Sequence, residues 1–124
     1  MNIGIAERVA ESARALYDDG DARGAINRAY YAMFYAARTS LVSLEPSLAI
    51  TKRHGEVISR FSKHVVLHHG LNRALGRSFN EVFKKRIASD YRLVEVDLAD
   101  AHQISLAADE FLDAIKAAKL DTSP

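Results

Sequence analysis

The sequence predicts an all-α fold, an up-and-down bundle of about five helices. Only two prolines occur, Pro46 and Pro124, and the six glycines fall mostly between periodic segments, as in chains built from helices and short turns. Apolar residues recur at three- and four-residue spacing in five segments, and no alternating pattern typical of a strand competes with them. Short connectors and the lack of an internal repeat favour antiparallel packing of neighbouring helices.

The first two helices are marked by an apolar stripe and by the turn between them. We expect the first helix at residues 5–18, with a stripe of Ile5, Val9, Ala13 and Leu16. The Asp-Gly-Asp turn at 19–21 ends it, and the Asp21 carboxylate can accept a hydrogen bond from the free amides of the next helix. The second helix should therefore run from Asp21 to about Leu44, where Glu-Pro-Ser at 45–47 stops it.

Three further helices complete the predicted bundle. Thr51 is the expected N-cap of a third helix through Val66, with a stripe of Val57, Phe61 and Val65. A fourth helix continues toward Tyr91 and carries Leu71, Leu75, Phe79, Val82 and Phe83. Residues 92–100 are a connector in which Asp97 is expected to cap the last helix. That helix has a four-three-four apolar spacing at Ile104, Ala108, Phe111 and Ile115.

Length, charge and cysteine content limit what the chain can be. Its 124 residues suit one domain, spanning residues 1–124. A formal net charge of +1 gives no general attraction to nucleic acid, so a site for a polyanion would have to be local. The absence of cysteine excludes disulfides and thiolate metal ligands and fits a reducing compartment. With no signal-peptide pattern and no apolar run of about 18 residues, we expect a cytoplasmic protein and no membrane contact.

The stretch NRAYYAMFYAAR, at residues 27–38, has two different faces when placed on a helix. One stripe is core, comprising Ile26, Ala29, Met33 and Ala37; the other is amphipathic, comprising Arg28, Tyr31, Tyr35 and Arg38. The amphipathic stripe suits either a contact surface or a site for a phosphate and a base. We expect mainly contact, in a homodimer that also uses the end of the fourth helix. Small residues would then permit close approach, namely Ala29, Ala32 and Ala36.

The run KKRIASDYR, at residues 84–92, is the second unusual segment. Arg86 and Asp90 are four residues apart and can pair on one helix face, with Tyr91 and Arg92 just beyond. A plain surface ion pair is one interpretation, and it would contribute roughly 0.3 to 0.5 kcal/mol. The other interpretation is a phosphate-directed site, because several basic residues gather at the end of an apolar helix.

Histidines offer candidates for proton transfer but not for a metal site. His64 and His68 are four residues apart, yet no third ligand is near them in the sequence, so we expect no metal. His54 lies at the start of the third helix beside Lys52 and Arg53, where a phosphate could be held, and it suits proton transfer. The alternative for His54 is a solvent-exposed side chain in a first helical turn. No Walker loop or dinucleotide fingerprint occurs, so we expect no cofactor.

Three segments together carry a family resemblance. AINRAYYAMFYAARTSL, KRHGEVISRFSKHVV and LGRSFNEVFKKRIASDYR resemble the HEPN domain family, in particular its small stand-alone branch, and the resemblance runs from about Val9 to Ile115. It implies a compact bundle of about five helices, usually a homodimer. It also implies an operon partner of the minimal nucleotidyltransferase (MNT) kind, which acts as the antitoxin of a toxin–antitoxin pair.

The resemblance further implies a site. Many family members are metal-independent endoribonucleases in which an arginine is followed, after four to six residues, by a histidine. Arg86 matches that arginine, whereas the positions for the histidine hold Tyr91, Arg92 and Leu93. Arg86 would hold the scissile phosphate, and Asp90 would act as base or orient Arg86. Independently of the resemblance, we expect His54 to supply the acid, because it is the only nearby group with a pKa suited to that role near neutrality.

Two function classes therefore stay open. In the first, the chain is the toxin-like half of a HEPN and nucleotidyltransferase pair that acts on RNA with a changed set of residues, or is held inactive by its partner. The Tyr91 hydroxyl is then where the resemblance would place nucleotide modification. In the second, the chain is a non-catalytic HEPN module that binds a nucleotide or a protein partner.

Overall fold

The computed structural model describes residues 2–51 and 53–121 and forms a helical bundle, which confirms the predicted fold class. Five α-helices lie within the described residues: α1 (Gly4–Asp18), α2 (Ala22–Leu44), α3 (His54–Arg60), α4 (Arg73–Asp90) and α5 (Leu98–Ala117). A 3-10 turn, η1 (Pro46–Ala49), follows α2, and a π-helical segment, η2 (Phe61–His68), continues α3. No helix in the described part combines the length and the apolar character that a membrane crossing requires.

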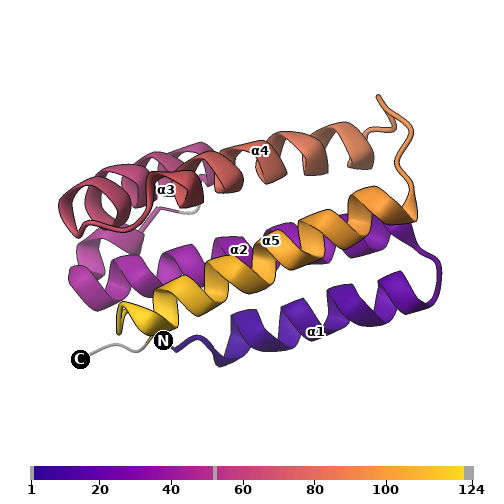
Figure 1. Ribbon diagram of the computed structural model, residues 1–124. Helices are drawn as coiled ribbons and strands as arrows, with labels where there is room; N and C mark the ends of the chain where they lie inside the picture. The colour runs from indigo at the N-terminus through magenta and orange to yellow at the C-terminus, as the bar shows by residue number, and fades with distance from the viewer. Residues whose placement is uncertain (1, 52, 122–124) are drawn as a thin grey trace.

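Helix α2 is the centre of the bundle. It contacts α1, α3, α4 and α5, and Figure 1 shows α1 and α4 on opposite sides of it. Its inward residues are fully buried, including the predicted core stripe of Ile26, Ala29, Met33 and Ala37. Three phenylalanine rings from η2, α4 and α5 pack together beside it, with ring centroids 4.8 to 5.7 Å apart: Phe61, Phe79 and Phe111. The side chains on α2 that face α3 and α4 are thereby held in a rigid frame.

Capping side chains begin three of the helices. The Asp21 carboxylate accepts from the Gly24 amide at 2.8 Å, as the sequence predicts. Asp97 caps α5, also as predicted, and its own amide donates back to the Asp100 carboxylate. Asn72, at the start of α4, accepts from a backbone amide in the same way. Each cap contributes about 1 kcal/mol and fixes where its helix begins.

The predicted cap at Thr51 is wrong, because its hydroxyl serves a local turn. It accepts from the Arg53 amide at 3.1 Å, so α3 begins at His54. The predicted stripe Val57, Phe61 and Val65 is nevertheless fully buried. The helical path also continues beyond the predicted end at Val66, as a π-helix to His68.

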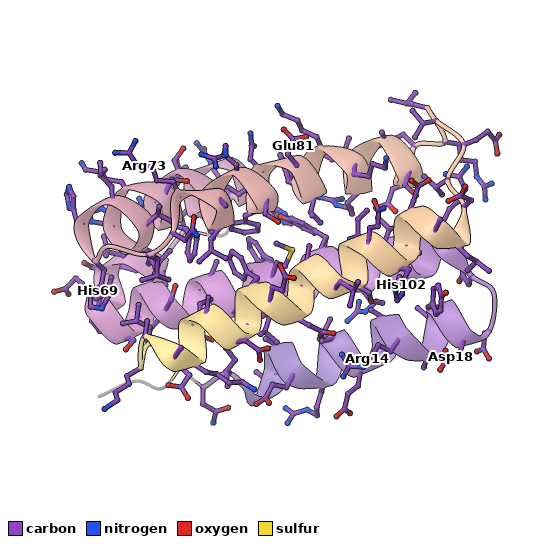
Figure 2. The ribbon with its side chains drawn as sticks, in the orientation of Figure 1. Arg14, Asp18, His69, Arg73, Glu81 and His102 are labelled. Atoms are coloured by element: carbon purple, nitrogen blue, oxygen red, sulfur yellow. The ribbon has the colours of Figure 1, made fainter. Side chains whose placement is uncertain are left out.

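The buried face of α1 differs from the predicted stripe. Val9 and Ala13 are buried as expected, but Ile5 is 44% exposed, and alanines take the inward positions instead. Small side chains allow α1 to lie close to α2. An Arg14–Asp109 ion pair of 2.8 Å and a Lys116–Glu7 pair of 2.8 Å then join α1 to α5, and Figure 2 labels Arg14 on α1.

The alanines expected at a dimer contact are also placed differently. Ala29, Ala32 and Ala36 are fully buried inside this chain, where they allow other helices of the same bundle to approach α2. They are therefore not available for close approach of a second copy. The physical reason is that the described stretch of α2 is covered on most sides, because it is the central helix.

Candidate functional site

Tyr30 is a polar residue at the centre of an aromatic cluster. It lies on the inward side of α2 with no solvent exposure, and its hydroxyl makes a 2.6 Å hydrogen bond with Nδ1 of His54 from the start of α3. Burial raises the pKa of the Tyr30 hydroxyl well above its usual value, and the positive charge of Arg86 only partly offsets this effect. Tyr30 therefore stays neutral and acts as a hydrogen-bonding group.

His54 is packed between aromatic rings. Its imidazole stacks on Phe34 at a centroid distance of 4.4 Å, with 15° between the planes, and lies 5.6 Å from the Tyr30 ring. The alternative of a simply solvent-exposed first-turn histidine is therefore wrong, since three helices supply its surroundings. Burial lowers the pKa of His54, and the nearby Arg86 charge lowers it further. A neutral imidazole at pH 7 follows.

Arg86 covers the same aromatic cluster from α4. Its guanidinium carbon lies 4.8 Å from the Tyr30 ring centroid and 5.6 Å from that of Tyr31, within cation–π range. The side chain is only 14% exposed, and Nε has no hydrogen-bond partner among the described residues. A buried cation is costly unless it has partners, and the Asp90 carboxylate supplies one; an anionic oxygen at the exposed part of the side chain would supply another.

Asp90 holds the guanidinium from one side. Its Oδ2 lies 3.4 Å from Nη1 of Arg86 and also accepts from the side-chain amide of Asn27 at 3.1 Å. Asp90 is thus fixed by α2 as well as by its own helix. This geometry suits a residue that orients Arg86, which is one of the two roles the sequence indicates for it.

Three of the four candidate residues come together, and the fourth does not. His54 from α3 and Arg86 from α4 both contact Tyr30, and Asp90 contacts Arg86. Tyr91 follows α4 with 73% of its surface exposed, outside the aromatic cluster. The sequence did not indicate Tyr30 as a member of the candidate site. Its position next to the core stripe could have indicated a buried hydroxyl that requires a partner.

A pocket of about 400 Å³ lies next to Asp90, between the start of α2 and the end of α4. Arg28 and Arg92 contribute cationic side chains to its lining, to which Asp21 and Asp90 add carboxylates. Arg23, which also lines it, donates to the backbone oxygens of Ser89 and Val94 and so fastens the connector after α4. The pocket could accommodate an anionic group beside Asp90.

The paired histidines of η2 lie apart from this cluster. The rings of His64 and His68 are 5.6 Å apart. Desolvation lowers the pKa of His64, and the charges of Lys63, His68 and Arg60 lower it further. Across residues 2–51 and 53–121, no group of three or more histidine, aspartate or glutamate side chains is placed to hold a metal ion.

Comparisons with known proteins agree with the fold. The HEPN domain family model matches residues 2–118. The UPF0332 protein of Thermotoga maritima is 33% identical over 107 residues, which cover 86% of this chain and 79% of that protein. A Methanocaldococcus jannaschii protein named "Putative toxin MJ0605" is 31% identical over 118 residues, covering 94% of this chain and 84% of the relative.

No solved structure was found that matches the chain significantly. The family match nevertheless covers nearly the whole sequence, from before α1 to just beyond the end of α5. Its extent agrees with the helical bundle described above. The chain therefore belongs to the HEPN domain family.

Proposed function

We propose that this chain acts on RNA as the toxin-like component of a HEPN and nucleotidyltransferase pair, with Arg86 and His54 as its catalytic residues. The observation that carries the proposal is their convergence: Arg86 from α4 and His54 from α3 both contact the ring or hydroxyl of Tyr30. A phosphate-binding cation and a proton-transfer group beside each other are the minimum that metal-independent RNA cleavage needs.

In the proposed reaction, Arg86 binds the nonbridging oxygens of the scissile phosphate. The ribose 2′ oxygen loses its proton to His54 and attacks phosphorus, and the bond from phosphorus to the 5′ oxygen breaks. The products are a 2′,3′-cyclic phosphate and a 5′ hydroxyl, and the proton taken by His54 can return to the leaving 5′ oxygen. Asp90 orients Arg86 through its contact with Nη1.

The direction of the His54 pKa favours the base as its first role. Burial and the Arg86 charge both keep the imidazole neutral near pH 7, whereas the sequence suggested an acid. If Nδ1–H donates to the Tyr30 oxygen, Nε2 keeps its lone pair and can accept the 2′ proton. Tyr30 would then fix the tautomer of the catalytic histidine.

Two proposed partners accompany this function. The name of the Methanocaldococcus relative supports a toxin role, and a small nucleotidyltransferase of the MNT kind is the proposed antitoxin. Tyr91, with 73% exposure, is accessible to such an enzyme for nucleotide transfer. Mass spectrometry of a Tyr91 peptide after co-expression would show the added nucleotide mass, and an unmodified peptide would contradict the transfer.

A second copy of the chain is the other proposed partner. Partly exposed tyrosines of α2 remain for a homodimer contact, although the neighbouring alanines do not. Tyr31 and Tyr35 supply large, rigid surfaces there. Light scattering should show a dimer at micromolar concentration for the wild type and a monomer for the Tyr35→Glu variant. A monomeric wild type would contradict the homodimer.

Incubation of RNA with the purified protein, without divalent metal, tests the nuclease function. Arg86→Ala should abolish cleavage, and His54→Gln should slow it by about 10²-fold or more, as loss of a general base does. Arg8→Gln is the control, because Arg8 is an exposed arginine of α1, on the far side of α2 from α4, and the variant should retain activity. RNA that stays intact at high wild-type concentration would exclude the enzyme.

A binding module without catalysis is the second candidate function. This function is favoured by the position of Arg86, whose side chain is mostly buried and paired with Asp90. The ion pair accounts for Arg86 without any role in cleavage. The neighbouring pocket, lined in part by Arg28 and Arg92, could then hold the phosphates of a nucleotide. Calorimetric titration with nucleotides would show binding that the double variant Arg28→Gln, Arg92→Gln loses.

A further inference from the structure

A broad surface groove of about 650 Å³ lies between η2 and α4, apart from the candidate site. It forms where the two helical segments approach closely, because a Cβ atom added to Gly76 would lie 3.0 Å from the Ser62 hydroxyl. Ile58 and Val66 supply apolar surface within the groove, and Ser59 supplies a hydroxyl. Nothing in the proposed cleavage reaction uses this surface.

The charge of the groove has one sign. Lys63, Arg73 and Arg77 line it, and no carboxylate does. All three cations are exposed, and none forms an ion pair among the described residues. Figure 2 shows Arg73 and Glu81 on the outer side of α4, but Glu81 lies beyond the groove lining and pairs with no cation there either.

The cationic side chains of α4 lie in a row along the helix and do not converge on one point. Arg73, Arg77 and Lys84 recur at spacings of four and seven residues, so they lie on one face of the helix. Eleven residues of helix are about 16 Å long. An open groove continued by such a row is suited to an extended polyanion, whereas a single phosphate would require converging donors.

The groove does not share a helix face with the catalytic residues. Arg77 and Arg86 are nine residues apart, which corresponds to about two and a half helical turns, so they point to opposite sides of α4. A polyanion held in the groove would therefore contribute affinity and leave the chemistry at Arg86 unchanged. The two surfaces can consequently be tested separately.

We infer that this groove and the α4 cation row bind the sugar–phosphate backbone of single-stranded RNA. The choice of RNA as the polyanion rests on the proposed function, while the location and the phosphate chemistry rest on the free cations and the missing carboxylates. Lys63, Arg73 and Arg77 contact phosphates. The side-chain hydroxyls of the groove and the side-chain amide of Asn80, which also lines it, donate to neighbouring oxygens. Binding of this kind is independent of base sequence and weakens as salt increases.

Fluorescence anisotropy of a labelled 2′-O-methyl RNA tests the inference, because this RNA keeps the phosphate backbone but has no free 2′ hydroxyl for the proposed cleavage. The double variant Arg73→Gln, Arg77→Gln should bind about tenfold more weakly or worse, with a slope of log affinity against log salt reduced by about 1.4. The double variant Arg8→Gln, Lys119→Gln is the matched control, since it removes the same charge from exposed sites outside the groove lining. The control should bind as the wild type does.

Equal affinities of the groove variant and its control would overturn the inference, as would tighter binding of polyglutamate than of RNA, which would indicate an acidic protein partner. If the groove variant does not fold by circular dichroism, Lys63→Gln, Lys84→Gln replaces it. Groove-dependent binding without cleavage of ordinary RNA would support the inference and contradict only the proposed nuclease. If the protein cleaves ordinary RNA but the groove variant binds RNA as tightly as its control, the proposed nuclease is supported and the inference about the groove is contradicted.

Discussion

At the residue scale, the Tyr30 hydroxyl connects the packing of the core to the chemistry of the candidate site. It is fully buried, and its hydrogen bond to His54 fixes the orientation of an imidazole that aromatic rings already confine. Arg86 lies over the same ring, so one side chain of α2 positions groups from two other helices. In our account Tyr30 is a positioning residue that never touches the substrate.

Removal of the hydroxyl should therefore cost stability. Tyr30→Phe leaves Nδ1 of His54 without its partner in a half-buried setting, and we expect a loss of about 1 to 3 kcal/mol in the free energy of unfolding. Tyr35→Phe is the control, because Tyr35 is only partly buried and its hydroxyl donates to no described residue. Urea denaturation measures both variants. Equal stabilities would show that the Tyr30–His54 bond carries no net energy.

The Arg86 charge should be visible in the titration of His54. Burial is the larger cause of the lowered His54 pKa and repulsion by Arg86 the smaller, so Arg86→Gln should move the pKa upward without restoring it to the usual value. NMR titration of the imidazole measures the shift. Arg92→Gln, which removes a charge that does not act on His54, should leave the pKa unchanged. An unchanged His54 pKa in the Arg86→Gln variant would show that the Arg86 guanidinium does not lie close to His54.

The same shift gives a pH dependence of stability. The folded chain binds a proton at His54 less readily than the unfolded chain, so unfolding takes up a proton in this range. The His54 contribution is complete above about pH 6.5, the unfolded value, and decreases as the pH falls toward the lower folded value. Denaturation series at several pH values should show that the free energy of unfolding decreases less for His54→Gln than for the wild type as the pH falls below about 6.5.

At the element scale, the close approach of η2 and α4 shapes both surfaces of α4. The inward side carries Phe83 and Arg86 toward Tyr30, and the outward side carries the groove cations. Gly76 is the contact point, since a Cβ there would meet the Ser62 hydroxyl at 3.0 Å. A side chain at this position decides how far apart the two segments lie.

Gly76→Val should separate these segments. The branched side chain fits only if Ser62 moves away, and overpacking of this kind costs about 1 to 3 kcal/mol. Gly55→Val in α3 is the control, because a Cβ at Gly55 meets no atom within 4 Å. Thermal unfolding should show a clearly lower Tm for Gly76→Val than for Gly55→Val. Equal Tm values would mean that η2 moves away from α4 at little cost in stability and accommodates the new side chain.

The elements themselves could be predicted closely, because the signals for them are local. Asp21 and Asp97 mark helix starts by their chemistry, and apolar spacing within one segment reveals its inward face. The convergence at Tyr30 could not be predicted in this way, since it depends on how α3 and α4 pack against α2. The predicted stripe of α1 was wrong at Ile5, again because the buried face depends on packing against another helix. Small alanines of α1 are buried, whereas Ile5 is exposed.

At the scale of the whole molecule, the site cannot be separated from the fold. Helix α2 contacts the other four helices and supplies Tyr30 and Asn27, while α3 and α4 bring His54 and Arg86. Figure 1 shows how α3 and α4 lie together over one side of α2, away from α1. A partner that shifts α4 against α2 would therefore change the distance between Arg86 and His54, and under the proposed function this shift would hold the chain inactive.

The most direct test of the central claim is the chemistry of the RNA ends after incubation with the protein in EDTA. If Arg86 and His54 promote attack by the 2′ oxygen, mass spectrometry should find fragments that end in 2′,3′-cyclic phosphate and begin with a 5′ hydroxyl. These fragments should be missing with Arg86→Ala and reduced by about 10²-fold with His54→Gln. RNA left intact by the wild type, or fragments ending in a 3′ hydroxyl, would contradict the account.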